Sequence, residues 1–130
     1  MAEMKFYRCN HCGNLVAVIE DGGVTPVCCG EKMELLEPGT TDAAKEKHVP
    51  VATRNENMIE VNVGEVDHPM TEAHLIEWIA LVGEKSIKIH RLSAGDKPSA
   101  HFAVCPHASC DCKHTVYAYC NLHGLFSCEI

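Results

Sequence analysis

Short apolar stretches that alternate with polar residues recur along the chain and predict β-strands. The clearest alternation places Ile59, Val61 and Val63 on one face, and a second one places Ile87 and Ile89 on one face. Turn-forming residues separate the stretches, and this arrangement is typical of antiparallel sheets. Further stretches rich in strand-forming residues are Lys5–Arg8, Leu15–Ile19, Met33–Leu36 and Thr115–Tyr119. The pattern predicts a mainly β protein.

One apolar stretch fits a helix as well as a strand. Leu75, Trp78, Ile79 and Val82 follow the i, i+3, i+4, i+7 template of an amphipathic helix. Thr71 precedes them and is available as an N-cap. The same residues also fit a strand of the surrounding sheet. Periodicity alone leaves both alternatives open.

A polar, turn-prone segment divides the chain into two parts. Residues 37–45 read Glu-Pro-Gly-Thr-Thr-Asp-Ala-Ala-Lys, and we place a domain boundary near residues 37–40. The first part, residues 1–37, is too short to hold a fold by burial alone and needs a disulfide, a metal or a partner chain. The second part, residues 38–130, has short strands at the spacing of an antiparallel sandwich.

The composition excludes several classes of protein. Of the 130 residues, 46% are hydrophobic and 22% are charged, which is typical of a globular protein. The formal net charge of −7 argues against nucleic acid as a partner, because phosphate binding needs a basic face. No apolar run approaches the roughly 18 residues of a membrane span, and the first residues do not resemble a signal peptide. We therefore expect a cytoplasmic protein that does not contact a membrane.

Nine cysteines and nine histidines are the unusual feature of the composition. In a reducing compartment clustered cysteines indicate metal ligands or reactive groups instead of structural disulfides. The first part carries Cys9-x-x-Cys12 and the adjacent pair Cys28-Cys29, and four thiolates suit Zn(II) or one tetrahedral iron. We favour iron, because a zinc ribbon more often carries a second C-x-x-C. The alternative is a small domain with buried or disulfide-bonded cysteines.

The geometry of such a first site has two consequences. An adjacent cysteine pair must strain the local chain for both sulfur atoms to reach one ion. Four protein ligands also close the coordination shell. The site can therefore hold the fold or pass an electron, but it cannot bind a substrate.

A second set of candidate ligands lies in the second part of the chain. A single histidine is usually an ordinary surface or hydrogen-bonded residue, but here several flank predicted strands and turns. One of them is tied to a cysteine by a C-x-x-H spacing. Five nitrogen or sulfur ligands can be drawn from Glu46-Lys47-His48-Val49-Pro50, Val66-Asp67-His68-Pro69-Met70, His74 and Cys120-Asn121-Leu122-His123-Gly124.

These motifs, in this order, resemble those of the superoxide reductases of the desulfoferrodoxin type, which have two iron centres. Cys9-x-x-Cys12 with Cys28-Cys29 is similar to the desulforedoxin-type, rubredoxin-like centre. The motifs similar to those of the catalytic domain are Asp42–Pro50, His68-Pro69-Met70 and Cys120–Leu125. The similarity spans nearly the whole chain.

The resemblance implies a fold and a ligand set. The fold is a desulforedoxin-like four-cysteine iron domain over residues 1–37, followed by an immunoglobulin-like antiparallel β-sandwich over residues 38–130. In that sandwich the stretch Leu75–Val82 is a strand. The second iron ion is held by four equatorial imidazoles and one axial thiolate, and the implied ligands are His48, His68, His74, His123 and Cys120.

The implied activity is the one-electron reduction of superoxide to hydrogen peroxide without formation of oxygen, as antioxidant defence in an anaerobe or microaerophile. Five protein ligands leave the sixth position of octahedral iron for a small ligand. A ferrous ion with one thiolate keeps a net positive charge, which attracts superoxide. The resemblance assigns Glu46 to the sixth position in the oxidised resting state, and Lys47 to attracting superoxide and placing a proton donor. It also implies a rubredoxin-like electron donor, and a homodimer is expected.

Two functions of other classes remain open. A sandwich with His48 early and Cys120-x-x-His123 late also fits an electron-transfer cupredoxin, although no axial methionine follows His123. The other alternative is a zinc-stabilised interaction module without catalysis. Two features depart from the family pattern. Phe126 stands where a tryptophan is usual, and four cysteines lie outside the pattern, namely Cys105, Cys110, Cys112 and Cys128. These cysteines could form a third metal site, but we interpret them as free thiols in an inserted loop, because their spacing lacks the paired C-x-x-C of common zinc sites.

Overall fold

The computed structural model describes residues 3–39, 48–64, 66–104 and 113–130. Within these residues the chain forms twelve β-strands and no α-helix, as the alternation of apolar residues predicts. The described part accordingly has no helix long and apolar enough to cross a membrane. Residues Glu3–Glu37 form one compact unit and Pro38–Ile130 form another. The two units are considered separately.

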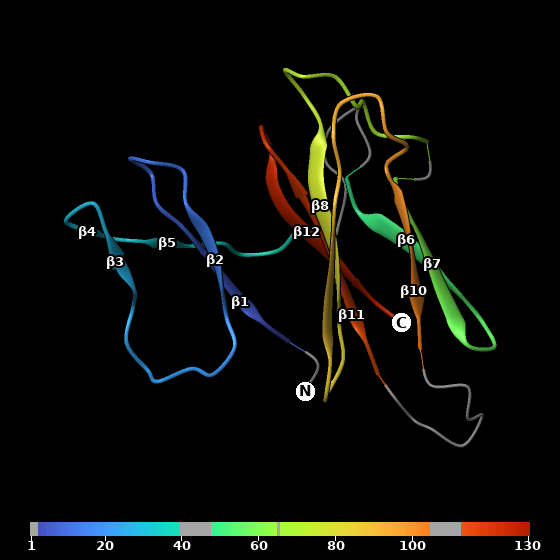
Figure 1. The fold of residues 1–130 in the computed structure, drawn as a ribbon, viewed down its shortest axis with the longest axis horizontal. Helices are drawn as coiled ribbons and strands as arrows, with labels where there is room; N and C mark the ends of the chain where they lie inside the picture. The colour runs from blue at the N-terminus through green and yellow to red at the C-terminus, as the bar shows by residue number, and fades with distance from the viewer. Residues whose placement is uncertain (1–2, 40–47, 65, 105–112) are drawn as a thin grey trace. The chain divides into compact units, whose positions relative to one another are not determined.

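The first unit is built on a three-stranded antiparallel sheet (Figure 1). Its central strand β1 (Lys5–Arg8) pairs with β2 (Leu15–Val18) on one side and with β5 (Glu34–Leu35) on the other. Strands β3 (Val27–Cys28) and β4 (Glu31–Lys32) form a separate hairpin. The hairpin and the β1–β2 connection each carry one cysteine pair.

Few residues of the first unit are available to form a core. One buried cluster consists of Tyr7, Cys9 and Met33, with Val18 and Cys28 packed against it. Two of these five residues are cysteines, so this cluster already includes part of the predicted metal site. A unit this small needs such additional support.

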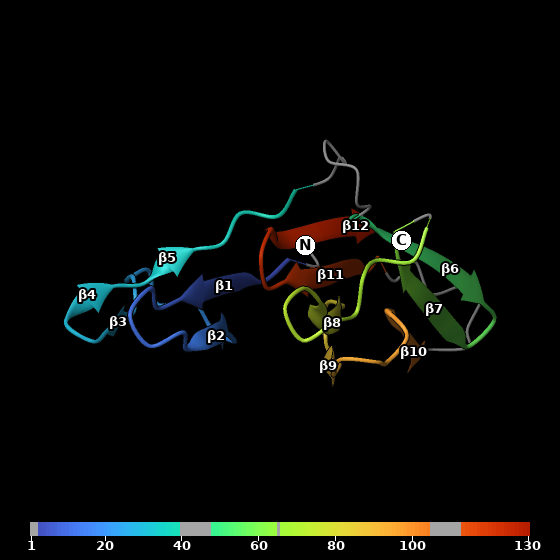
Figure 2. The ribbon, with the colours of Figure 1, turned by 90° about the horizontal axis from the view of Figure 1, so that it is seen from above.

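The second unit consists of two antiparallel sheets (Figures 1 and 2). The three-stranded sheet has the order β10-β7-β6 and the four-stranded sheet has the order β12-β11-β8-β9. Figure 2 shows the two sheets as two layers. The bounds are β6 Pro50–Asn55, β7 Met58–Val63, β8 Ile76–Val82, β9 Ile87–Arg91, β10 Ser99–Ala103, β11 Thr115–Cys120 and β12 Gly124–Glu129.

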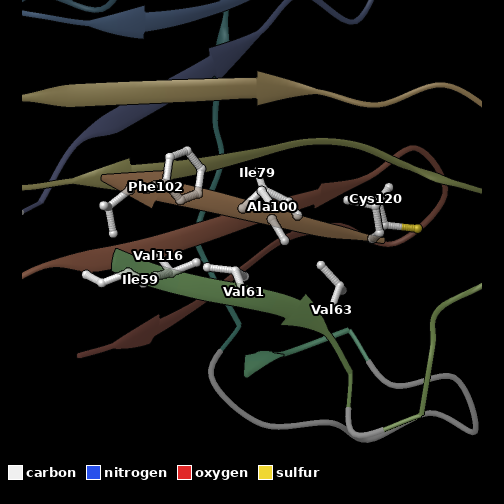
Figure 3. Close-up of a cluster of buried hydrophobic side chains, with 11 residues drawn as sticks. Ile59, Val61, Val63, Ile79, Ala100, Phe102, Val116 and Cys120 are labelled. Carbon is white, nitrogen blue, oxygen red and sulfur yellow. The ribbon is translucent and has the colours of Figure 1, made fainter. Parts of the chain in front are cut away.

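The core of the second unit is formed by inward-facing side chains of both sheets (Figure 3). The predicted alternation on β7 is confirmed, because Ile59, Val61 and Val63 are all buried in this core. Cys120, the last residue of β11, belongs to the same cluster and lies at one end of it (Figure 3). The packing of the sandwich therefore fixes the position of a candidate ligand.

The ambiguous apolar stretch is strand β8, as the resemblance implies. Residues Trp78–Val82 are all buried, so the strand lacks the alternation that identifies a strand with one exposed face. Thr71 is not the N-cap of a helix, and its Oγ1 atom instead accepts a hydrogen bond of 3.1 Å from the backbone N–H of His74. That bond closes a turn before the strand and does not start a helix.

Candidate metal centres

The four cysteines of the first unit converge. All four Sγ atoms lie within 4.8 Å of one another, with 3.6 Å between those of Cys12 and Cys28 and 3.9 Å between those of Cys28 and Cys29. Tetrahedral ligands at about 2.3 Å from an ion are about 3.8 Å apart. All four are free thiols, so the disulfide alternative is wrong for these residues. The spacing fits a tetrahedral metal ion.

Tight turns carry both cysteine pairs. The Asn14 carbonyl accepts a 2.8 Å hydrogen bond from the Cys9 N–H, and the Cys9 carbonyl accepts one of 3.0 Å from the N–H of Gly13. Gly13 has φ of +81°, which a glycine adopts readily. Cys29 has φ of +53°, a left-handed conformation that is strained in a residue with a side chain, and Gly30 follows it at +75°. The strain expected of an adjacent cysteine pair is present.

The electrostatics of the cluster favour a bound cation. Backbone N–H groups of Cys12 and His11 stabilise the Cys9 thiolate and lower the pKa of Cys9 to about 6. The surrounding sulfur atoms of Cys12, Cys9 and Cys28 raise the pKa of Cys29 to about 12. Successive ionisation of clustered thiols is thus opposed by their own charge. A metal ion removes this conflict and lets all four act as thiolates.

The second candidate site is formed at one end of the sandwich. His48 precedes β6, His68 follows β7, and His74 precedes β8. Cys120 ends β11, and His123 lies in the turn that leads into β12. Within each sheet these strand ends lie at the same end, because the neighbouring strands are antiparallel. The structure brings together all five residues that the resemblance implies as ligands.

The four imidazoles form a closed ring. Going around it from His48 through His68, His74 and His123 and back to His48, the distances between ring centroids are 4.7, 4.6, 5.1 and 4.7 Å. The diagonal from His48 to His74 is longer, at 6.2 Å. Neighbouring rings meet edge to face, at angles of 63° to 82°. This arrangement is close to a square with one imidazole at each corner.

Hydrogen bonds indicate which nitrogen atoms face the centre of the ring. Nδ1 of His68 lies 2.7 Å from the Pro69 carbonyl oxygen, which leaves Nε2 as the second nitrogen. Within the described part of the chain, Nε2 of His68 and of His74 are buried without a hydrogen-bond partner. Burial lowers the pKa of His68 to about 4, so its imidazole is neutral at pH 7. Buried imidazole nitrogens without hydrogen-bond partners fit metal ligands.

A tight hairpin holds Cys120 and His123 together. Cys120 and Gly124 are paired across β11 and β12, so three residues form the loop, and Gly124 has φ of +87°. Within it, Sγ of Cys120 lies 3.7 Å from Nδ1 of His123. The register of β11 against β8 shifts between Tyr119 and Cys120, and such bulges redirect side chains. The C-x-x-H spacing is thus the geometry of one hairpin turn.

Two further side chains support the site. The ring of Phe126 stacks on His48 with centroids 4.7 Å apart and planes inclined by 18°, so the aromatic residue singled out from the sequence lies at the site. Asn121 bonds to the backbone on both sides of His74. Asn121 was not predicted as a functional residue. The only signal for it in the sequence is its position inside the C-x-x-H motif.

Several predicted residues are not placed in the site. Glu46, Lys47, Cys105, Cys110 and Cys112 lie outside the described residues. Cys128 is described, and the prediction of a loop is wrong for it, because it lies on β12, half-buried against the core. Cys128 is a free thiol, as predicted, and burial raises its pKa to about 11.

The protein is all-β and has a four-cysteine cluster in one unit and four imidazoles next to a thiol in the other. This combination is typical of the class of metalloproteins with two metal centres. The profile of the desulfoferrodoxin family matches residues 40–129, and that of the desulfoferrodoxin N-terminal domain matches residues 1–36. The chain therefore belongs to the desulfoferrodoxin family.

Individual relatives match the chain over nearly its full length. It is 46% identical to a desulfoferrodoxin of Nitratidesulfovibrio vulgaris, covering 98% of this chain and 97% of that protein. It is 48% identical to a desulfoferrodoxin of Syntrophotalea carbinolica, covering 99% of each chain. Among solved structures, the superoxide reductase of Treponema pallidum matches with a TM-score of 0.81 and 29% identity, covering 98% of this chain and 99% of that one.

The cupredoxin alternative is not supported by this geometry. Mononuclear copper sites of electron-transfer proteins use two imidazoles and one thiolate in a trigonal arrangement. The ring of four imidazoles exceeds that ligand set. The closest methionine in sequence to the histidines, Met70, uses its sulfur to accept a hydrogen bond from the Ile76 N–H.

Proposed function

We propose that this protein is a superoxide reductase that converts superoxide to hydrogen peroxide by one-electron reduction, without forming oxygen. The observation that carries the proposal is the square of four imidazoles with the Cys120 sulfur next to it. Membership of the desulfoferrodoxin family supports it, and so does the structural similarity of this chain to a superoxide reductase.

We propose iron as the metal of both centres. His48, His68, His74 and His123 would hold the second ion through imidazole nitrogens, and Cys120 through its sulfur. Four nitrogens and one sulfur exceed the four ligands of structural zinc and leave one position of an octahedral ion free. When bound there, ferrous iron supplies the electron and part of the positive charge that attracts superoxide.

The protein's own groups set the state of the proposed ligands. The Pro69 carbonyl accepts from Nδ1–H of His68, which fixes the tautomer with its lone pair on Nε2. The Cys120 thiol lies in the apolar core, where water is excluded. A thiolate there is stable only beside a cation, so Cys120 contributes its negative charge when metal is present.

Product formation needs two protons and an intact oxygen–oxygen bond. We propose that Lys47, next to His48 in the sequence, attracts superoxide and helps place the proton donor. Glu46 would occupy the sixth position in the oxidised resting state. Both roles rest on the resemblance of this segment to the family motif.

The remaining parts of the proposal concern the supply of electrons. The four-cysteine centre of a domain over residues 1–37 would pass electrons, and residues 38–130 would form the catalytic domain. A rubredoxin-like protein is the proposed donor, a homodimer the proposed assembly, and the cytoplasm the proposed location.

Metal analysis combined with a visible spectrum of the oxidised protein tests the proposal. Protein purified without oxygen from iron-supplied cells should contain about two iron ions per chain, one in the four-cysteine site and one in the site with five proposed ligands. Zinc alone, in place of iron, would instead support the non-catalytic alternative.

A further inference from the structure

The side chain of Asn121 brackets His74. Its Oδ1 atom accepts a hydrogen bond of 3.0 Å from the Leu75 N–H, and its Nδ2 atom donates one of 3.0 Å to the Ala73 carbonyl. The backbone N–H of Asn121 adds a third bond, of 3.2 Å, to the Leu75 carbonyl. The residues before and after His74 are thus tied to a single side chain more than forty positions away.

The turn that contains His74 does not by itself fix where this histidine lies. Thr71 and His74 bond to each other, through the Thr71 N–H to the His74 carbonyl at 2.9 Å and through the His74 N–H to Thr71 Oγ1 at 3.1 Å. These bonds shape the turn locally. Asn121 supplies the connection to the β11–β12 hairpin, on which Cys120 and His123 lie.

We propose that Asn121 is a positioning residue that holds His74 at the distance from Cys120 and His123 that metal binding requires. The inference rests on the ligand set of the proposed function. A carboxamide is suited to this role because it offers one donor and one acceptor in a fixed plane, and the two bonds to Ala73 and Leu75 use both. Alanine at this position removes both side-chain bonds and leaves the backbone N–H available for its bond to the Leu75 carbonyl.

Release of cobalt(II) to a chelator from the full chain tests the role. Two kinetic phases are expected, one for each centre, and Cys12→Ser identifies the phase of the four-cysteine centre. Asn121→Ala should accelerate only the other phase, by about 10- to 100-fold, the usual effect of losing a group that orients a ligand. Asn55→Ala, at an exposed position at the end of β6, is the matched control and should leave both phases unchanged.

Double mutants separate positioning of His74 from a general structural role. In a His74→Ala background, Asn121→Ala should have no further effect on the release rate, whereas in a His68→Ala background it should still accelerate release. Equal acceleration in both backgrounds would overturn the positioning role. Asn121→Asp, which keeps the acceptor for the Leu75 N–H, provides a second variant if alanine impairs folding, and it should also accelerate release.

The outcomes distinguish this inference from the proposed function. If Asn121→Ala releases cobalt(II) as slowly as the unmodified protein, while His74→Ala releases it faster, only the positioning role is overturned. If His74→Ala and His68→Ala both release it at the unmodified rate, the proposed ligand set is wrong, and the inference is overturned with it.

Discussion

Nε2 of His48 lies 3.0 Å from Nδ1 of His123, although 75 positions separate the two residues in the sequence. Two nitrogen ligands about 2.1 Å from one ion and at right angles to each other are about 3.0 Å apart. His48 is buried beneath the ring of Phe126, and His123 is held by the hairpin turn. The fold therefore provides the spacing of adjacent metal ligands.

The close approach of Gly39 to Phe126 predicts a packing effect next to His48. A Cβ atom at position 39 would lie 3.1 Å from two ring carbons of Phe126. Gly39→Ala should therefore lower the free energy of unfolding by about 1 kcal/mol, since overpacking forces the ring to move. Urea denaturation of the metal-free protein measures this change.

Two further variants check this explanation. Gly22→Ala is the matched control, because a Cβ atom there meets nothing within 4 Å. In a Phe126→Leu background, Gly39→Ala should cost much less, since the ring carbons are gone. An undiminished cost in that background would contradict the proposed contact.

The two centres should have separable roles. Cys12→Ser should alter the absorption of the four-cysteine centre and leave peroxide formation by chemically pre-reduced protein nearly unchanged, because that centre has no open position. Cys120→Ser should abolish turnover, since a neutral hydroxyl replaces the buried thiolate. Stopped-flow mixing with superoxide measures both. Loss of the fast reaction in Cys12→Ser with the second site still loaded would refute the division, and full activity of Cys120→Ser would remove Cys120 from the site.

Lys47 should increase the rate of superoxide capture. A positive charge about 6 Å from an anion is worth roughly 0.7 kcal/mol at the dielectric of water, which corresponds to about threefold in rate. Lys47→Ala should therefore slow the bimolecular reaction of the reduced protein at least threefold and flatten its dependence on ionic strength. Pulse radiolysis over a range of salt concentrations provides both quantities.

A second lysine provides the control for steering. Lys113 precedes β11, whose other end carries Cys120, so about 20 Å of strand separates it from the site. At physiological salt, charges beyond about 8 Å are largely screened. Lys113→Ala should leave the rate and its salt dependence nearly unchanged. If Lys47→Ala behaves in the same way, the attraction comes from the metal alone.

Cys128 should make the protein less stable at alkaline pH. Burial raises its pKa to about 11 from an ordinary value of 9.0, so between these values the unfolded chain loses a proton that the folded protein keeps. The contribution of the thiol to stability is therefore complete below pH 9 and lost as the pH rises to 11. Between pH 9 and pH 11 the free energy of unfolding of Cys128→Ala should therefore fall less than that of the unmodified protein, and the difference should be up to about 2 kcal/mol. Parallel curves for the two proteins would contradict the raised pKa of this half-buried thiol.

Alternation in the sequence identifies strands with one buried face better than central strands. It predicts β7, where Ile59, Val61 and Val63 face the core, because their neighbours are less buried. It does not decide β8, where apolar residues occupy both faces. It misses β10, although this strand also has one buried face, because its alternation consists of only two buried apolar residues, Ala100 and Phe102. The strand assignment of β8 came from the resemblance to a family and not from periodicity.

The candidate ligands were identifiable from motifs, but the contacts that organise them were not. The C-x-x-H spacing is enough to predict that Cys120 and His123 lie close together, because both lie on one hairpin. The order of the imidazoles around the ring depends on the pairing of strands that are distant in the sequence. The bonds of Asn121 to Ala73 and Leu75 depend on the same pairing, so no local pattern reveals them.

The products formed from superoxide test the central claim most directly. Reduction consumes one superoxide, one electron from the protein and two protons, and yields one hydrogen peroxide. Pre-reduced, iron-loaded protein mixed with a substoichiometric amount of superoxide should therefore give one peroxide for each superoxide consumed and no dioxygen. Half as much peroxide together with evolved dioxygen would indicate dismutation, and it would contradict the assignment of this protein as a superoxide reductase.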